Sequence, residues 1–204
     1  MDTRRSFLIA GGLALIPSSI GSRAFAAAGA SPTDYIRALG NRVLEVINGN
    51  SSLEQKRAYF HLLLQQDFDI PGIARFVLGP YWQSASEPER QEVIRLLDAY
   101  IMATFGRRLA EYGGVSLRVT GSRGTLSEPL VTSEIIRPGG APPIKLDWML
   151  GGRGGVYKII DLVVDNVSMV ASQRSEFAAT IQRSGGTVGG LIARMRQTIA
   201  TAGG

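Results

Sequence analysis

The stretch from Ile144 to Leu150 reads IKLDWML, and its apolar side chains stand mainly at every second position. These apolar residues share one face of an extended chain, while Lys145 and Asp147 take the other face. A period of two residues is typical of a β-strand with one buried face. We therefore predict a strand here, and we locate the other elements by where this period begins and ends.

Segments with the same period lie on both sides of this stretch. Short turns rich in glycine and proline separate them, and short connections between successive strands indicate antiparallel pairing. From Tyr157 to Val164 the last segment is apolar on both faces apart from Lys158 and Asp161, so we expect it to be central in the sheet or covered on both sides. The predicted strands are Val115–Val119, Leu130–Ile136, Ile144–Leu150 and Val156–Met169.

Outside this central region, apolar residues recur every three to four positions, which is typical of amphipathic helices. Ser52 with Gln55 predicts a capping box, and Ser86 precedes a second clear helix start. Helices, then an antiparallel sheet, then helices predict a single α+β domain. The predicted helices begin near Ser31, Ser52, Asp69 and Ser86, and a C-terminal helical region is broken at Ser184-Gly185-Gly186.

Residues 1–26 are typical of a bacterial export signal. Arg4-Arg5 followed by Ser-Phe-Leu resembles the twin-arginine type, with the general secretory route as the alternative. An apolar run of about ten residues follows, which is too short to span about 30 Å of hydrocarbon. Ala24-Phe25-Ala26 supplies the small side chains that a signal peptidase requires. We expect residues 1–26 to be removed and residues 27–204 to form one domain in the periplasm.

The composition excludes several kinds of site. The 204 residues include no Cys and one His, which excludes disulfides, thiolate ligands, Cys nucleophiles and multi-His metal centres. Taken alone, the net charge of +5 suggests that the partner is nucleic acid or an acidic membrane surface. Three arginines and one aspartate of residues 1–26 supply +2 of it, so +3 remains for the rest of the chain. Because no basic cluster with interleaved aromatic residues is present, we expect no nucleic-acid partner.

Two ionisable residues have apolar neighbours. Asp161 interrupts an apolar strand, where burial could suit it to proton transfer; pairing with an arginine or capping a turn is the structural alternative. His61 lies among apolar residues of a predicted helix and is interpreted as structural. Because no paired acid and base are evident, we predict no catalytic residue, no metal site and no enzyme activity.

The segment 68–82 reads FDIPGIARFVLGPYW, and on its own it fits either a packed helix end or the wall of an apolar pocket. Together with Ser86-Glu87-Pro88-Glu89-Arg90, with YKIIDLVVDNVSM at 157–169 and with Arg174-Ser175-Glu176-Phe177, it resembles the MlaC or toluene-tolerance family of periplasmic lipid-binding proteins. The resemblance covers essentially all of residues 31–197. It departs from the family pattern at Tyr157, where Trp is usual, and at Asn166, where Gly is usual.

The resemblance implies an NTF2-like, cystatin-like fold, in which helices wrap a curved antiparallel sheet and enclose a deep apolar cavity. It implies that this cavity takes phospholipid acyl chains and leaves the head group outside. The implied partners are an outer-membrane lipoprotein–porin complex and an inner-membrane ABC transporter with an MCE-domain protein, between which the family moves phospholipid. We further expect a monomer that holds phospholipid as its ligand and needs no cofactor.

Apolar positions on the predicted helices and strands are the candidate walls of this cavity. Arg75, Arg107 and Arg108 are candidates for its mouth, where they would meet phosphate, with a solvated surface position as the alternative for each. The expected lipid-binding residues are Phe76, Val77, Tyr81, Trp82, Leu97, Tyr100, Ile101 and Phe105 from the helices, and Ile135, Leu146, Trp148, Leu150, Ile160, Leu162 and Val164 from the sheet.

Three alternatives stay open from the sequence. The ligand is a hopanoid-type lipid if the chain belongs to the hopanoid-associated branch of the family, HpnM. The chain is an enzyme on an NTF2-like scaffold if Asp161 acts as a base. It is a periplasmic adaptor if the apolar positions form only a filled core.

Overall fold

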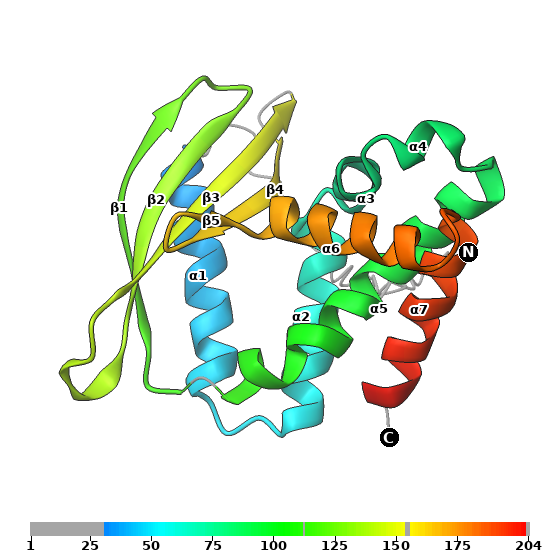
Figure 1. Ribbon diagram of the computed structural model, residues 1–204. Coiled ribbons are helices and arrows are strands. Elements are labelled where there is room, and N and C mark those ends of the chain that lie inside the picture. Colours follow the sequence, from blue (N-terminus) through cyan, green and yellow to red (C-terminus); the bar gives the residue numbers. More distant parts are fainter. Residues whose placement is uncertain (1–30, 112, 154–155, 203–204) are drawn as a thin grey trace, which may run out of the picture.

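The computed structural model describes residues 31–111, 113–153 and 156–202, apart from the side chains of 107–111 and Arg153. The export signal predicted at residues 1–26 lies outside these ranges. Figure 1 shows the helices arranged around one sheet. The helices are α1 (Pro32–Asn48), α2 (Leu53–Asp67), α3 (Ile70–Leu78), α4 (Tyr81–Ser84), α5 (Glu87–Glu111), the 3-10 turn η1 (Pro138–Gly140), α6 (Met169–Arg183) and α7 (Val188–Ala202).

Local capping explains why the helices begin where the sequence predicts. At the start of α2 the Ser52 hydroxyl accepts from the Gln55 N–H at 3.2 Å, and the Gln55 side chain accepts from the Ser52 N–H at 2.8 Å. At the start of α5 the Glu89 carboxylate accepts from the Ser86 N–H at 2.9 Å. Each contact gives an otherwise unpaired N–H at a helix start a partner. The predicted capping box and both starts are confirmed.

The strands form one antiparallel sheet in the order β1-β2-β3-β4-β5, so each strand pairs with its neighbours in the sequence. This arrangement follows from the short turns between the strands. The prediction of an α+β fold with an antiparallel sheet is confirmed. The strands are β1 (Ser116–Gly124), β2 (Pro129–Ile136), β3 (Ile144–Arg153), β4 (Val156–Val164) and β5 (Val167–Ser168).

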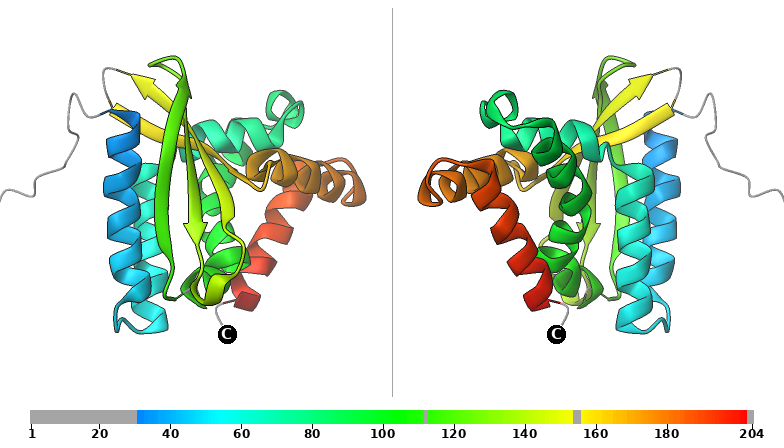
Figure 2. Two further views of the ribbon diagram at one scale, coloured as in Figure 1. Left: turned by 90° about the vertical axis from the view of Figure 1, so that its left-hand side faces the viewer. Right: turned by 90° about the vertical axis from the view of Figure 1, so that its right-hand side faces the viewer.

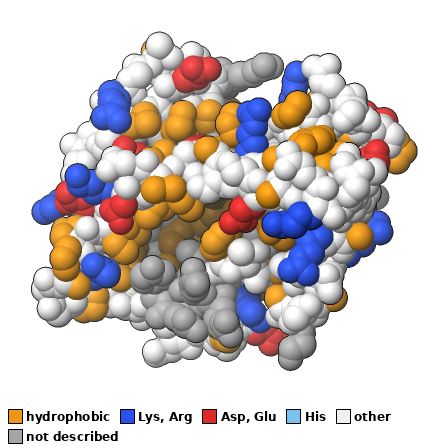
Figure 3. All heavy atoms as spheres, viewed as in Figure 1, with side chains coloured by type: hydrophobic (Ala, Val, Ile, Leu, Met, Phe, Trp, Pro, Cys, Tyr) orange, Lys and Arg blue, Asp and Glu red, His pale blue; other side chains and the backbone are white. Residues whose placement is uncertain are grey.

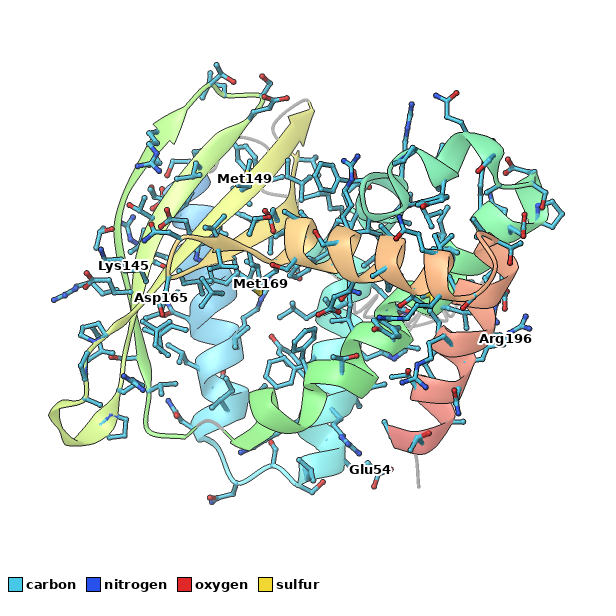
Figure 4. The ribbon with its side chains drawn as sticks, viewed as in Figure 1. Glu54, Lys145, Met149, Asp165, Met169 and Arg196 are labelled. Carbon is cyan, nitrogen blue, oxygen red and sulfur yellow. The ribbon has the colours of Figure 1, made fainter. Side chains whose placement is uncertain are left out.

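The prediction of one continuous strand over 156–169 is wrong. Asp165 and Asn166 have φ angles of 46° and 67°, which turn the chain between β4 and the two-residue β5. Two successive positive φ angles are the requirement of the tightest hairpin turns, and Asp and Asn tolerate them best among residues other than glycine. The turn is fixed to β3, because the Asp165 N–H donates to the Lys145 carbonyl at 3.0 Å and the Lys145 N–H donates to the Asp165 carboxylate at 3.1 Å. Figure 4 shows the two residues side by side.

A bulge interrupts the alternation of side chains in β4. Met149 pairs with Asp161 and Leu150 pairs with Ile159, so Ile160 is an extra residue in the ladder. As a result Ile159 and Leu150 are both fully buried. The outer edge of β4 meets the end of α2, where the Asp69 N–H donates to the Ile159 carbonyl at 3.0 Å.

Helices cover the sheet from one side, and the remaining helices form a second layer beside it (Figure 2). Ile36 and Leu39 of α1 pack against Val131, Leu146 and Trp148 of the sheet. The helices α3, α5, α6 and α7 instead pack on one another. In the part of the chain that the structure describes, no helix has the length and apolarity to cross a membrane.

The buried apolar residues fall into three separate clusters. The helical cluster joins α3, α5, α6 and α7 around residues such as Val77, Leu97 and Phe177. The sheet cluster joins α1 to β2, β3 and β4, and the lower cluster consists of Ile47, Phe60 and Val115. Two partly buried residues connect them: Phe68 packs on both the helical and the sheet cluster, and Ile135 packs on both the sheet and the lower cluster.

Candidate functional site

An apolar hollow opens on the face of the molecule shown in Figure 3. Comparison with Figure 1 places it below the junction of β5 and α6, with the sheet on one side and α5 on the other. Hydrophobic side chains gather around the hollow, and Met169 at the start of α6 lies at its upper edge (Figure 4). The hollow therefore occupies the space between sheet and helices where the resemblance implies an apolar cavity.

Several apolar side chains at the borders of the clusters are only partly buried, and space remains beside them. Met102 of α5 and Ile135 of β2 are partly buried against the lower cluster. Leu162 and Val164 of β4 are partly buried against the sheet cluster. A close-packed interior would merge the clusters and leave these side chains enclosed. The protein therefore has partly exposed apolar side chains in its interior, between the sheet and the helices.

The structure brings the predicted sheet residues together, with one exception. Leu146, Trp148 and Leu150 are buried in the sheet cluster, while Ile135, Leu162 and Val164 are partly buried against it. The pairs Leu146 with Val164 and Trp148 with Leu162 stand opposite each other, so their side chains share a face. Ile160 belongs to none of the clusters, because the bulge puts Ile159 in the position that simple alternation assigns to Ile160.

The predicted helical residues belong mainly to the helical cluster. Val77 and Leu97 are buried inside it, 1% and 0% exposed. Tyr81, Trp82, Tyr100 and Ile101 are partly buried against it. Phe76 and Phe105 are the exposed members, at 45% and 38%. Twelve of the fifteen predicted residues thus belong to or pack against the helical or the sheet cluster, and the other three are Phe76, Phe105 and Ile160.

Of the three arginines predicted for the cavity mouth, only Arg75 has a described side chain. The side chains of Arg107 and Arg108 lie outside the described residues. Arg75 is exposed on α3 and lines a separate surface pocket with Phe76, Trp82 and Arg174. Its exposed position agrees with the surface alternative that the sequence left open for it.

A buried polar pair that sequence reasoning missed anchors the indole of Trp148. The Trp148 Nε1–H donates to the Ser133 hydroxyl at 2.9 Å, and that hydroxyl donates to the Leu146 carbonyl at 2.6 Å. Ser133 is 2% exposed, and both of its hydrogen bonds lie inside the sheet cluster. Trp148 is thereby held in one orientation in that cluster.

Asp161 caps the start of α6, which agrees with the structural alternative to catalysis given by the sequence. Its carboxylate accepts from the Ser168 hydroxyl at 2.5 Å and from the Val170 N–H at 3.1 Å, and Ser168 in turn accepts from the Ala171 N–H at 3.0 Å. Both Asp161 oxygens are therefore engaged at the start of α6, where a carboxylate is favoured by the helix dipole. Within the described ranges no basic side chain pairs with it.

His61 connects α2 to α5. Its Nε2 lies 2.9 Å from the Asp98 carboxylate, which also accepts from the Gln65 amide at 2.7 Å. Asp98 is 9% exposed, so these contacts provide the partners that a buried carboxylate needs. His61 and Gln65 are four residues apart, so they lie on the same face of α2. This spacing in the sequence could have indicated that both side chains bind one partner. The structural interpretation of His61 agrees with this arrangement.

No metal site is evident in the described ranges, where no three His, Asp or Glu side chains gather as ligands would. The site is thus apolar, with its ionisable groups placed at helix starts and helix contacts.

Comparison with known proteins assigns the chain to a family. Residues 37–197 match the family model described as "MlaC protein". The chain belongs to the MlaC family. A curated member of similar sequence is the intermembrane phospholipid transport system binding protein MlaC of Haemophilus influenzae, which is 22% identical over 177 residues, or 82% of each chain.

A solved structure shows the same fold as this MlaC-family chain. It is a phospholipid-binding protein from Ralstonia solanacearum, determined in complex with a phospholipid. The two match with a TM-score of 0.74 at 19% identity, over 86% of this chain and 100% of the other.

Proposed function

We propose that this protein is a periplasmic phospholipid carrier that encloses acyl chains in the apolar hollow. The observation that carries the proposal is the hollow between three unmerged apolar clusters in a chain of the MlaC family. The related proteins from Haemophilus influenzae and Ralstonia solanacearum are both named for phospholipid, which supports the same ligand here.

The physical demand on a carrier agrees with the chemistry of the hollow. Exposing an acyl chain to water costs about 0.8 kcal/mol per CH₂, or on the order of 20 kcal/mol for two long chains. A carrier offsets this cost with enclosed apolar surface and needs no reactive side chain. The partly buried residues Leu162, Val164, Ile135 and Ile101 are the members of the predicted set that we place nearest the lipid. Val77 and Leu97 support the walls from within the helical cluster.

The proposed route is between the two membranes. An outer-membrane lipoprotein–porin complex and an inner-membrane ABC transporter with an MCE-domain protein are the proposed partners, with the carrier itself a monomer. Export by the signal at residues 1–26 would deliver residues 27–204 to the periplasm. Asp161 is fully engaged at the start of α6, so we assign it no catalytic role.

The first experiment identifies the ligand. The protein is purified from its host, its lipids are extracted, and the extract is analysed by mass spectrometry. We expect near-stoichiometric phospholipid. A hopanoid in its place would move the chain to the hopanoid-associated branch. A lipid-free protein that also takes up no lipid from liposomes would exclude the carrier role and leave the adaptor.

A matched pair of variants tests whether the hollow holds the lipid. Leu162→Asn places an amide beside the sheet cluster, whereas Leu126→Asn makes the same change at a loop position that is 82% exposed. We expect the first variant to retain much less lipid per protein and the second to retain the wild-type amount. Equal retention in two folded variants, with folding checked by circular dichroism, would place the lipid elsewhere.

A further inference from the structure

A second pocket lies on the outside of the helical layer, away from the hollow. It has a volume of about 440 Å³ and is formed by α3, α4 and α6. Its distinctive residues are Arg75, Phe76, Trp82 and Arg174. Arg174 follows Met169 by five residues on α6, which places it about 140° around the helix from the residue at the edge of the hollow. The helix α6 therefore separates the two sites.

The guanidinium of Arg174 is held in place by apolar contacts. Its Cζ lies 5.2 Å from the centroid of the Phe76 ring, over the ring face. On another side it lies against Gly79, where a Cβ atom would come within 2.8 Å of the Arg174 Nε. Stacking of this kind fixes the plane of a guanidinium and leaves its N–H edges available to a ligand. The position of Arg174 is thus determined without any anionic partner from the protein.

The pocket has an excess of positive charge. Within the described ranges, neither Arg75 nor Arg174 has a carboxylate within 4.0 Å, although several other arginines do. The nearby Asp69 is not among the residues that line the pocket, and it accepts from the Gly72 N–H at the start of α3. Two arginines without partners beside an exposed aromatic ring form an environment for an anion that carries an organic group.

We propose that this pocket binds a phosphate ester, with the phosphate on Arg75 and Arg174 and the organic part against Phe76 and Trp82. Guanidinium groups match phosphate through paired N–H donors, and two of them suit a group with several anionic oxygens. The volume exceeds the need of a bare phosphate and accommodates an attached glycerol-sized group. The source of the phosphate ester is either a phospholipid head group at a membrane surface or a soluble glycerophosphate. This site goes beyond the proposed carrier function, since it needs no acyl chain in the hollow.

Calorimetric titration with glycerol 3-phosphate at constant ionic strength tests the site. We expect saturable binding that Arg75→Gln and Arg174→Gln each weaken at least about tenfold. Arg183→Gln is the matched control, because Arg183 is exposed on the same helix as Arg174 and its side chain hydrogen-bonds only to Thr180 among the described residues. The Arg75 side chain has no hydrogen-bond partner within the described ranges, so Arg75→Gln keeps the test decisive even if Arg174→Gln disturbs the contact between α3 and α6.

The outcomes separate the possible ligands. Absence of saturable binding, equal weakening by Arg183→Gln, or equally strong binding of acetate would overturn the proposal, the last in favour of an acidic peptide. Loss of sedimentation with phosphatidylglycerol vesicles in both pocket variants, but not in the control, assigns the site to lipid head groups. Unchanged sedimentation with lost glycerol 3-phosphate binding assigns it to soluble esters. Mass spectrometry of co-purified lipid on the same variants reports on the carrier function separately, so failure of one proposal is distinguishable from failure of the other.

Discussion

The Asp161 carboxylate and the Ser168 hydroxyl lie 2.5 Å apart and connect the sheet to the first turn of α6. Asp161 is on β4 and Ser168 ends β5, so the contact closes the hairpin at the point where its second strand gives way to α6. Because Met169 at the edge of the hollow is the next residue, this hydrogen bond also sets the position of the upper rim.

We expect Asp161→Ala to destabilise the protein by about 1–3 kcal/mol, because it leaves the Val170 N–H and the Ser168 hydroxyl without their acceptor. Asp161→Asn keeps an acceptor oxygen and is expected to cost less. Urea unfolding of both variants measures the difference. Equal stability of Asp161→Ala and the wild type would show that the start of α6 does not depend on this carboxylate.

Glu92 is expected to make stability depend on pH in the acid range. Hydrogen bonds from Arg95 and from Arg196 of α7 lower the pKa of Glu92 to about 2, from an ordinary value of 4.5. A depressed pKa in the folded state means that this contribution is present above pH 4.5 and is lost as the pH falls towards 2. Figure 4 shows Arg196 on the outer side of α7.

The measurement for Glu92 is the unfolding temperature of Glu92→Gln and the wild type between pH 2 and pH 8. We expect the difference in unfolding temperature between the two proteins to be constant near neutral pH and to narrow below pH 4.5. High salt should also reduce this difference, since Glu92 and its two arginine partners lie near the surface. Glu54→Gln is the control, as Glu54 has no arginine partner among the described residues. A difference of the same size at every pH would contradict the prediction.

Gly79 is expected to tolerate no side chain without loss of stability. Its φ of 54° and ψ of −125° lie outside the regions open to other residues. We predict that Gly79→Ala costs about 1–3 kcal/mol. Gly189→Ala in α7 should be neutral or slightly stabilising, because an added Cβ would make only an ordinary contact, at 3.7 Å from Glu89 Oε1. Thermal unfolding of the two variants compares them directly, and similar effects would argue against backbone strain at Gly79.

Gly40 is expected to set the distance between α1 and β1. A Cβ at this position would overlap Cδ2 of Leu117, which packs against the sheet cluster. We predict a loss of about 1–3 kcal/mol for Gly40→Ala. Adding Leu117→Ala should recover part of that loss, because it removes the overlapping atom. A double-mutant cycle measures the recovery, and strict additivity of the two effects would refute the contact.

The helix starts and the central strand were predicted correctly because they depend on residues that are close together in the sequence. Ser52 and Gln55 cap each other across one helical turn, and the Glu89 carboxylate accepts from the N–H and the hydroxyl of Ser86, so no distant residue is needed to place these helix starts. The alternation in 144–150 likewise survives in β3, because Leu146 and Trp148 face a single apolar layer.

Longer-range effects explain the errors. The turn at Asp165 and Asn166 is held by hydrogen bonds to Lys145, which is 20 residues away in the sequence. Because local sequence does not show this contact, the apolar residues on both sides of the turn favoured one continuous strand. The bulge that displaces Ile160 depends on pairing with β3 and leaves no mark in the apolar pattern. The stacking of Arg174 on Phe76 joins residues far apart in the chain, so spacing alone could not place Arg75 in a pocket with it.

The free edge of the sheet affects whether the protein aggregates at high concentration. β1 is the outermost strand, its register shifts between Val119 and Gly121, and Arg118 and Arg123 project from it as exposed charges. A kinked and charged edge is a poor template for another strand. At the opposite edge, β5 and the contact with Phe68 shorten the exposed part of β4. A molecule that keeps apolar surface open for cargo thereby offers its neighbours no straight edge along which to polymerise.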